Sequence, residues 1–595
     1  MHWKLMRGLM CLLFAVAAVS AFGQTARFTG QVTDPQGAAI FNAQVQIVNL
    51  ETLVSRKIKT DITGNYTVPF LPAGKYQITV TAEGFGPSHG GDLPITAGQA
   101  FIYNVQLGVA NANASVTVEG QTAAQIETEN AEVSGTITEK EVVGFGLNGR
   151  IATQLIALTP GVSNQTGQDE GKTGVIGSAK YSVNGGRVQY NVFEADGSDI
   201  LNNSINAARG GNTFVVNPSV DAIAEIKVLT SSYGAMYGRT ASGIVQMTTK
   251  SGTQDFHGNL YEFVRNEMFN ARNYFDNTTK GAPLYRRNDF GGTIGGPLYI
   301  PGVFNRKKDK SFFFFSEEAR LEKTPVAYNQ AVPSTAERNG DFNDVCPAVG
   351  SGIYVTTTTK SQYPDCPITN NPVNSTIYPQ FTYAGSGGVT NLLPIDPISR
   401  GFLASGLLPT ANSVTGCNST ASIMTNPACY IASVSPSTYY REELFRIDHN
   451  LTANQMLDFR YIHDTWDTTV LSPQWGMVMN SFPTVQNHIV GPGLSLIAAL
   501  SSTLGHGFQN HISLGYIAEH VTLTALAAPG VTLDRSAMDN DILDKGTTNP
   551  AWGAMGSFFN NGYGDKLPGL LFKGTNQAYG GHGFNMDTGY TPGAR

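Results

Sequence analysis

Apolar and polar residues alternate in short runs through segment 28–107, and residues typical of turns separate these runs. The clearest runs are YTVPF at 66–70 and YQITV at 76–80, where most second side chains are apolar. A period of two is typical of strands that bury one face, and DPQG at 34–37 favours a tight turn between strands. We therefore predict an antiparallel β-sandwich within residues 24–110.

The alternation stops in segment 111–130, which is small, polar and free of aromatic residues, as is typical of a linker. A short β-prone stretch interrupts the linker, formed by Ser115, Val116, Thr117, Val118 and Glu119. An extended segment of this kind can be captured as an added strand by the sheet of a partner. The same residues could equally form the last strand of the sandwich.

A mixed pattern of helix and strand covers residues 131–252. In GLNGRIATQLIALTPGV at 146–162, apolar residues recur at helical spacing, and Pro160-Gly161 ends the element. We expect YSVNGGRVQYNVFEADGSD at 181–199 to form a hairpin, and NPSVDAIAEIKVLTS at 217–231 to form a short helix that feeds a strand. GIVQMTTK at 243–250 adds another strand. These elements predict a compact α+β unit.

After residue 253, the pattern predicts strands with one apolar and one charged face. In FRIDHNLTANQMLDFRY at 445–461, two alternating runs flank a polar turn. A soluble sandwich can place such charges in water, but a transmembrane barrel places the apolar side chains toward lipid and the charges toward a wet lumen. The tight turn contrasts with the long polar connection 324–438, and outer-membrane barrels show this asymmetry.

Composition narrows the function further. Charged residues make up 14% of the chain, against a globular norm of about 25%. The net charge of -7 provides no basic field for phosphate backbones, so nucleic acid is not an expected partner. H-E-x-x-H is absent, and GQDEGKT at 167–173 is one residue short of a phosphate-binding loop. We therefore predict no catalytic, metal or cofactor site, and no enzyme activity.

The N-terminus has the features of an export signal. Lys4 and Arg7 precede an apolar run at 9–19, which is too short to cross a hydrocarbon core of roughly 30 Å, so residues 1–23 are predicted to be a cleaved signal peptide. Export favours disulfides. Local pairs, 346 with 366 and 417 with 429, are the first expectation, although four cysteines allow three connectivities. All four lie in the long connection: Cys346, Cys366, Cys417 and Cys429.

Two parts of the chain resemble known families. T-D-x-x-G-x-Y at 60–66, followed by L-x-x-G-x-Y and A-x-G-F, resembles the carboxypeptidase regulatory-like domain. GLNGRIATQLIALTPGV, DAIAEIKVLTSSYGAMYGRTASGIVQMTTKSG and FRIDHNLTANQMLDFRY resemble the TonB-dependent outer-membrane transporters, in the Oar-like branch that carries such a domain at its N-terminus. The resemblance implies a mainly β fold: a β-sandwich at 24–110, a linker at 111–130, an α+β plug at 131–252 and the first part of a transmembrane antiparallel β-barrel at 253–595.

The resemblance also implies import across the cell outer membrane rather than chemistry. A ligand, whether a siderophore, an oligosaccharide or a peptide, would bind outside the cell. The TonB protein of the inner membrane would pull on a segment near the plug, driven by the proton-motive force, and residues 115–119 are the candidates for this TonB contact. Five charged plug residues are predicted to form internal ion pairs that set plug release: Arg150, Arg187, Asp196, Glu225 and Arg239.

The stretch GIVQMTTKSGTQDFHGNLYEF at 243–263 is then expected to join the plug to the barrel. Gly252 would allow a turn there, and Phe256, Tyr261 and Phe263 would lie near the lipid interface. About 22 strands close such a barrel, and about seven or eight can be placed after Gly252, so we expect either the N-terminal part of a longer protein or a truncated product. An alternative function is an exported surface protein whose sandwich binds carbohydrate or another protein without transport.

Overall fold

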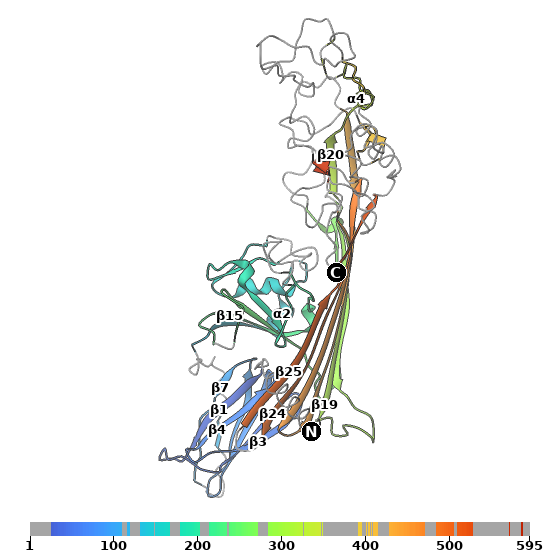
Figure 1. The fold of residues 1–595 in the computed structure, drawn as a ribbon. Coiled ribbons are helices and arrows are strands. Elements are labelled where there is room, and N and C mark those ends of the chain that lie inside the picture. Colours follow the sequence, from blue (N-terminus) through green and yellow to red (C-terminus); the bar gives the residue numbers. More distant parts are fainter. Residues whose placement is uncertain are drawn as a thin grey trace, which may run out of the picture.

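The structure is a computed structural model in which three β-rich units follow one another along the chain (Figure 1). The mainly β fold class is therefore confirmed. The predicted signal peptide lies outside the described residues, as does most of the linker. The described residues are 25–109, 116–118, 131–147, 149–166, 179–202, 213–234, 237–271, 284–324, 326–344, 346, 348, 391–395, 400, 403–404, 406, 408–413, 428–470, 484–504, 508–527, 570–571 and 585–586.

The first unit, the sandwich, packs two sheets around one apolar core that includes Phe28, Val45 and Tyr76. One sheet has the order β4-β1-β7 with β8 also beside β1, and the other has the order β3-β2-β5-β6-β9. The pairing is mixed rather than wholly antiparallel, because β7 and β8 run parallel to β1 and β9 runs parallel to β6. The strands are β1 (Ala26–Thr33), β2 (Gln44–Asn49), β3 (Ser55–Lys59), β4 (Asn65–Leu71), β5 (Gly74–Thr81), β6 (Ser88–Ile95), β7 (Ala100–Ile102), β8 (Val105–Gln106) and β9 (Val116–Val118).

The second unit, the plug, is built on a five-stranded sheet of order β10-β15-β16-β13-β14. The hairpin predicted at 181–199 forms only in its last part, where β13 pairs with β14 in antiparallel fashion. Strand β12 instead pairs with β11 in a separate sheet, and β13 also pairs with β16 in parallel. The helical element predicted within 146–162 forms as the 3₁₀ helix η1. The elements are β10 (Val133–Thr138), α2 (Glu139–Gly144), η1 (Ala152–Leu158), β11 (Val162–Asn164), β12 (Tyr181–Val183), η2 (Val188–Tyr190), β13 (Val192–Ala195), β14 (Ser198–Asp199), η3 (Val220–Ala222), β15 (Ile223–Ser231) and β16 (Ile244–Thr249).

The third unit, the long sheet, has eight antiparallel strands in the order β17-β18-β19-β22-β23-β24-β25, with β26 also beside β24. The tight turn predicted between the two charged runs is present, because Thr452 at the end of β22 pairs with Gln455 at the start of β23. The strands are β17 (His257–Asn266), β18 (Arg286–Pro297), β19 (Ser311–Lys323), β22 (Ser437–Thr452), β23 (Gln455–Val470), β24 (Val485–Leu504), β25 (Phe508–Glu519) and β26 (Thr522–Ala527). A short 3₁₀ helix, η4 (Glu267–Phe269), follows β17.

The long connection between β19 and β22 begins and ends as a hairpin. Strand β20 (Val326–Ala331) pairs with β21 (Cys429–Val434), and a short helix, α4 (Thr335–Arg338), follows β20. Cys346 is disulfide-bonded. Cys366 and Cys417 lie outside the described residues, so the predicted pairing of the four cysteines stays a prediction. A further small pair joins β27 (Leu570–Leu571) and β28 (Asn585–Met586).

The plug packs against one face of the long sheet, and the sandwich lies below the plug (Figure 1). A single apolar cluster joins the plug to the long sheet, because Phe314, Leu444 and Ile462 belong to the same core as the plug strands. The sandwich contacts the long sheet through Phe70, whose ring stacks on His511 with centroids 6.1 Å apart. None of the described helices has the length and apolar character needed to cross a membrane.

Candidate functional site at the contact of plug and long sheet

Antiparallel register arranges the inward side chains of the long sheet in rows that cross the strands. Glu318, Glu442 and Asp464 are paired neighbours on β19, β22 and β23, and we call them the acidic row. Arg446 and Arg460 form a second such pair, which we call the basic row. Leu444 and Ile462 lie between the two rows. Because every second residue of a strand faces the same side, the charged face predicted for these strands points at the plug.

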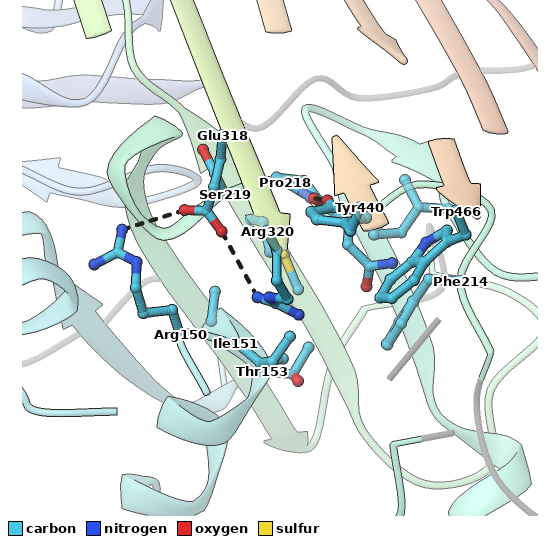
Figure 2. Close-up of a pocket in the computed structure, with 14 residues that line it drawn as sticks. Arg150, Ile151, Thr153, Phe214, Pro218, Ser219, Glu318, Arg320, Tyr440 and Trp466 are labelled. Atoms are coloured by element: carbon cyan, nitrogen blue, oxygen red, sulfur yellow. Dashed lines mark hydrogen bonds and ion pairs between the residues drawn. The ribbon is translucent and has the colours of Figure 1, made fainter. Parts of the chain in front are cut away.

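The acidic row meets a cation and a backbone amide of the plug. The Arg150 guanidinium bonds the carboxylate of Asp221, and its Nη2 lies 3.3 Å from Oε2 of Glu318. The backbone N–H of Asn217 donates to Oδ2 of Asp464 at 3.0 Å. Figure 2 shows Glu318 between Arg150 on the plug and Arg320 on its own strand, whose Nη2 lies 3.7 Å from Glu318 Oε1. All of these carboxylates are buried.

Arg150 is held in position by its backbone and by two aromatic rings. Its φ of 50° lies in the left-handed region, which few residues other than glycine adopt. Its guanidinium carbon lies 4.5 Å from the ring centre of Tyr261 and 4.2 Å from that of Phe263. The prediction that these two rings lie at the lipid interface is therefore wrong. Tyr261 instead donates from its hydroxyl to Glu318 Oε2 at 3.0 Å, whereas Phe256 is exposed.

The basic row meets the plug at Asp196. Nη1 of Arg446 and Nη1 of Arg460 lie 3.5 Å and 3.4 Å from the two oxygens of this carboxylate. Asp196 also accepts from the backbone N–H of Thr249 at 2.9 Å, so β16 fixes its orientation. Arg460 donates to the backbone oxygen of Ala195 at 2.7 Å. Two arginines of the long sheet thus bind the turn after β13.

A third set of charges within the long sheet contacts the backbone next to Arg150. Asp289 on β18 accepts from Nε of Arg287 at 2.7 Å and from Nε of Arg320 at 2.6 Å. Both arginines also donate to the backbone oxygen of Gly149, next to Arg150. Sequence reasoning missed these residues. The signal that could have found them is the alternation of charges in SEEARLE at 316–322, which places Glu318 and Arg320 on one face of β19.

The cavity within this contact has a volume of about 20 Å³, and Arg150, Asn217, Tyr440 and Trp466 are among the residues that line it. Tyr440 donates from its hydroxyl to the backbone oxygen of Asn217 at 2.8 Å. Pockets for small molecules are typically 300–1,000 Å³ in volume. This small cavity therefore leaves no room for a ligand. A larger cavity of about 630 Å³ lies where the sandwich, the plug and the long sheet meet, and Asp196, Glu225 and Arg446 are among the residues that line it.

The remaining predicted residues lie elsewhere. Arg239 pairs with Asp199 at 2.5 Å inside the plug, and its side chain is 59% exposed. Arg187 is exposed at the start of η2 and forms no ion pair with any described residue. Of the candidate TonB contact, residues 116–118 form β9 on the sandwich, whereas Ser115 and Glu119 lie outside the described residues.

Glu225 contacts the sandwich rather than the long sheet. Its Oε1 accepts from the backbone N–H of Ala97 at 2.5 Å. Lys227, two residues along β15, has its Nζ 3.9 Å from Glu132 and faces Gly98 of the same sandwich loop. Burial raises the pKa of Glu225 from 4.5 to about 7, although the Ala97 hydrogen bond and Lys227 both oppose this shift.

We therefore expect the attachment of the sandwich to the plug to depend on pH. Glu225 binds a proton more tightly when buried than when exposed, so attachment is strongest below about pH 4.5, weakens as the pH rises toward about 7 and is then constant. The full change is about 3 kcal/mol at most. Hydrogen exchange of residues 96–99, measured from pH 5 to 8, checks this expectation. Glu225→Gln should abolish the slope, and Glu83→Gln, at an exposed sandwich position, should leave it as in the wild type.

Comparisons with known proteins agree with this architecture. Residues 248–587 match the family model described as "Outer membrane beta barrel domain", and residues 27–108 match that of the carboxypeptidase regulatory-like domain. The chain is 26% identical over 317 residues to "TonB-dependent transporter Oar" of Myxococcus xanthus, which covers 50% of this chain and 27% of that relative. The chain therefore spans about a quarter of the length of that relative.

Two solved structures of outer-membrane proteins also show similarity. The outer membrane transporter YddB from Escherichia coli matches with 10% identity and a TM-score of 0.36, over 65% of this chain and 39% of that protein. The ferric enterobactin receptor PfeA from Pseudomonas aeruginosa matches with 13% identity and a TM-score of 0.30, over 67% of this chain and 46% of that protein. TM-scores of this size do not establish a shared fold. Because the barrel family matches more than half of the residues and the long antiparallel sheet lies within the matched range, the chain belongs to the outer membrane beta barrel domain family and is a protein of the cell outer membrane.

Proposed function

We propose that this protein is a TonB-dependent receptor and transporter that imports a ligand with energy from the proton-motive force. The observation that carries the proposal is the way in which the plug is attached to the long sheet. Arg150 of the plug contacts the acidic row, and Asp196 of the plug contacts the basic row. The apolar residues Leu444 and Ile462 lie between the two contacts. Similarity to a curated TonB-dependent transporter supports the same function.

Ion pairs suit a contact that must open and close. A charge pair at about 4 Å is worth about 4 kcal/mol at a protein surface but only about 1 kcal/mol in bulk water. Water that enters between Arg150 and the acidic row therefore weakens the contact and favours further opening. When the plug returns, burial restores the strength of each pair, and the geometry of the rows restores the register.

The outward face of the long sheet fits contact with outer-membrane lipid. Leu260 on β17 is 92% exposed and Leu514 on β25 is 73% exposed, and Leu321 and Phe459 are exposed on the same outward face. An apolar outward face with a charged inward face is the pattern of a transmembrane barrel. The ligand in this proposal is a siderophore, an oligosaccharide or a peptide.

The proposed coupling segment, residues 115–119, gives the test of this function. Deleting these five residues from the protein in its native cells should abolish energy-dependent uptake and leave surface binding intact. Labelled ferric siderophores, maltodextrins and peptides serve as probes, with and without a protonophore that collapses the proton-motive force. Deleting residues 121–125 shortens the same linker by the same length and should preserve uptake.

Two results would contradict the proposal. Uptake that persists without residues 115–119 would remove the coupling role from this segment. Binding of a probe by the wild type without any uptake would favour the alternative, an exported surface protein that binds carbohydrate or another protein.

A further inference from the structure

The described part of the coupling segment, residues 116–118, pairs with the sandwich in this structure. Residues 116–118 form β9, which pairs in parallel with Ser88, His89 and Gly90 of β6. Without β9, strand β6 would be the edge of its sheet. The end of the sandwich also contacts the chain just before β6. The N–H of Gly86 donates to the backbone oxygen of Gly108 at 2.9 Å.

The β6 edge is open to strand addition over a short length. Natural edge strands are usually protected by charged side chains, prolines or bulges, and Ser-His-Gly at 88–90 has none of these. A bulge protects the edge of β6 directly after Gly90. Tyr76 of β5 pairs with Leu93, whereas Ile78 pairs with Gly90, so β6 carries one extra residue and forms a bulge. Asp92 in this bulge has a φ of 53°. The bulge limits the added strand to about three residues.

We propose that the β6 edge at Ser88–Gly90 is an intramolecular binding site for the coupling segment, and that a partner protein must exchange this pairing for its own. The expected partner is a protein with a β-sheet that has a free edge, because such an edge binds the backbone groups of an extended segment. The inference rests on the proposed role of residues 115–119. It adds that the regulatory-like sandwich controls access to this segment.

Successive residues of a strand direct their backbone groups to opposite edges, and the pairing with β6 occupies one edge of residues 116–118. A partner that pairs along this same edge must displace β6 first. The bulge of β6 limits this pairing to about three residues, and the structure describes three, residues 116–118. A partner strand that pairs with all five residues of 115–119 makes more backbone hydrogen bonds, each of which adds a modest net stability. The pairing with β6 therefore delays capture without preventing it.

A disulfide across the pairing tests the proposal. His89→Cys combined with Thr117→Cys places thiols on directly paired residues, and neighbouring strands lie about 4.8 Å apart, within the range that a disulfide spans. The full chain is purified from outer membranes, and binding of the soluble periplasmic domain of TonB is measured in the oxidised and reduced states. Oxidation should lower the affinity at least tenfold, and reduction should restore it. The matched control, Gln46→Cys with Lys57→Cys, crosslinks β2 to β3 and should bind equally in both states.

The outcomes separate this inference from the proposed function. Equal TonB binding in the oxidised and reduced crosslinked variant overturns the binding site on β6 and leaves the coupling role intact. Failure of the disulfide to form under mild oxidation also overturns it. If neither the wild type nor the reduced variant binds TonB, the coupling role fails, and the inference that rests on it fails with it.

A second measurement needs no substitution. Hydrogen exchange of the wild type is followed before and after addition of the TonB domain. Residues 88–90 should exchange faster once TonB has removed β9, whereas residues 44–49 in the centre of the same sheet should be unchanged. Unchanged exchange at 88–90 upon TonB binding overturns the proposal.

Discussion

Arg150→Ala is expected to weaken the attachment of the plug to the long sheet by about 3–5 kcal/mol. The substitution leaves the carboxylates of Asp221 and Glu318 buried without their plug cation. Removing one partner of a buried ion pair is costly because the remaining charge has already lost its water. Glu318 keeps Arg320 at 3.7 Å and the hydroxyl of Tyr261 at 3.0 Å, so we expect the lower end of this range. Susceptibility of the plug to protease, followed during a urea titration in detergent, measures this change.

Arg239→Ala is the matched control for Arg150. Both residues are plug arginines with positive φ and a carboxylate partner. The side chain of Arg239 is 59% exposed, so its loss should cost less than about 1 kcal/mol. Equal effects of the two substitutions would contradict the assignment of Arg150 to the contact. Outer-membrane levels of both variants, compared by immunoblot, separate weakened attachment from failed assembly.

Gly493→Ala is expected to prevent the plug from seating on β24. A Cβ at this position would lie 1.7 Å from the backbone oxygen of Val215 and 2.6 Å from Oδ1 of Asp464. Neither neighbour can move away easily, because the first is backbone and the second is buried in the acidic row. Overpacking of this kind costs about 1–3 kcal/mol, and more where backbone must shift. We expect a cost at the upper end of this range or above it.

Loss of the hydrogen bond from Asn217 to Asp464 should accompany the displacement caused by Gly493→Ala. Faster hydrogen exchange at residues 213–220 measures it. The matched control is Gly515→Ala on the adjacent strand β25, where the nearest atom to the added Cβ is Ser198 Oγ at 3.6 Å. Exchange that is as slow in Gly493→Ala as in Gly515→Ala would show that the plug does not require this glycine.

The sequence predicts local structure well where one periodicity dominates. The alternating runs at 66–70 and 76–80 predicted strands of the sandwich, and these are β4 and β5. Charges at every second residue of 445–461 predicted two strands with one charged face, and these are β22 and β23. Such patterns are informative because neighbouring residues of a strand must face opposite sides. The alternation of apolar and polar residues therefore indicates which face of each strand is buried.

Orientation could not be predicted where both faces of a strand carry apolar residues. On β17, Leu260 and Val264 point outward while Tyr261 and Phe263 contact Arg150. Both sets are apolar or aromatic, so the pattern alone permits either choice. The position of the plug cation decides between them, because an arginine is attracted to the face of an aromatic ring.

The sequence by itself determined the strands, the charged faces and the order of the three units, because these depend on residues close together along the chain. Tertiary structure alone decided which charges meet. Arg150 and Glu318 are 168 residues apart, and only the register of the long sheet and the seating of the plug bring them together. The same holds for residues 115–119, for which the sequence left two interpretations open. In the folded protein the described part of this segment pairs with β6, because a sheet edge supplies the hydrogen-bonding groups that an isolated strand lacks.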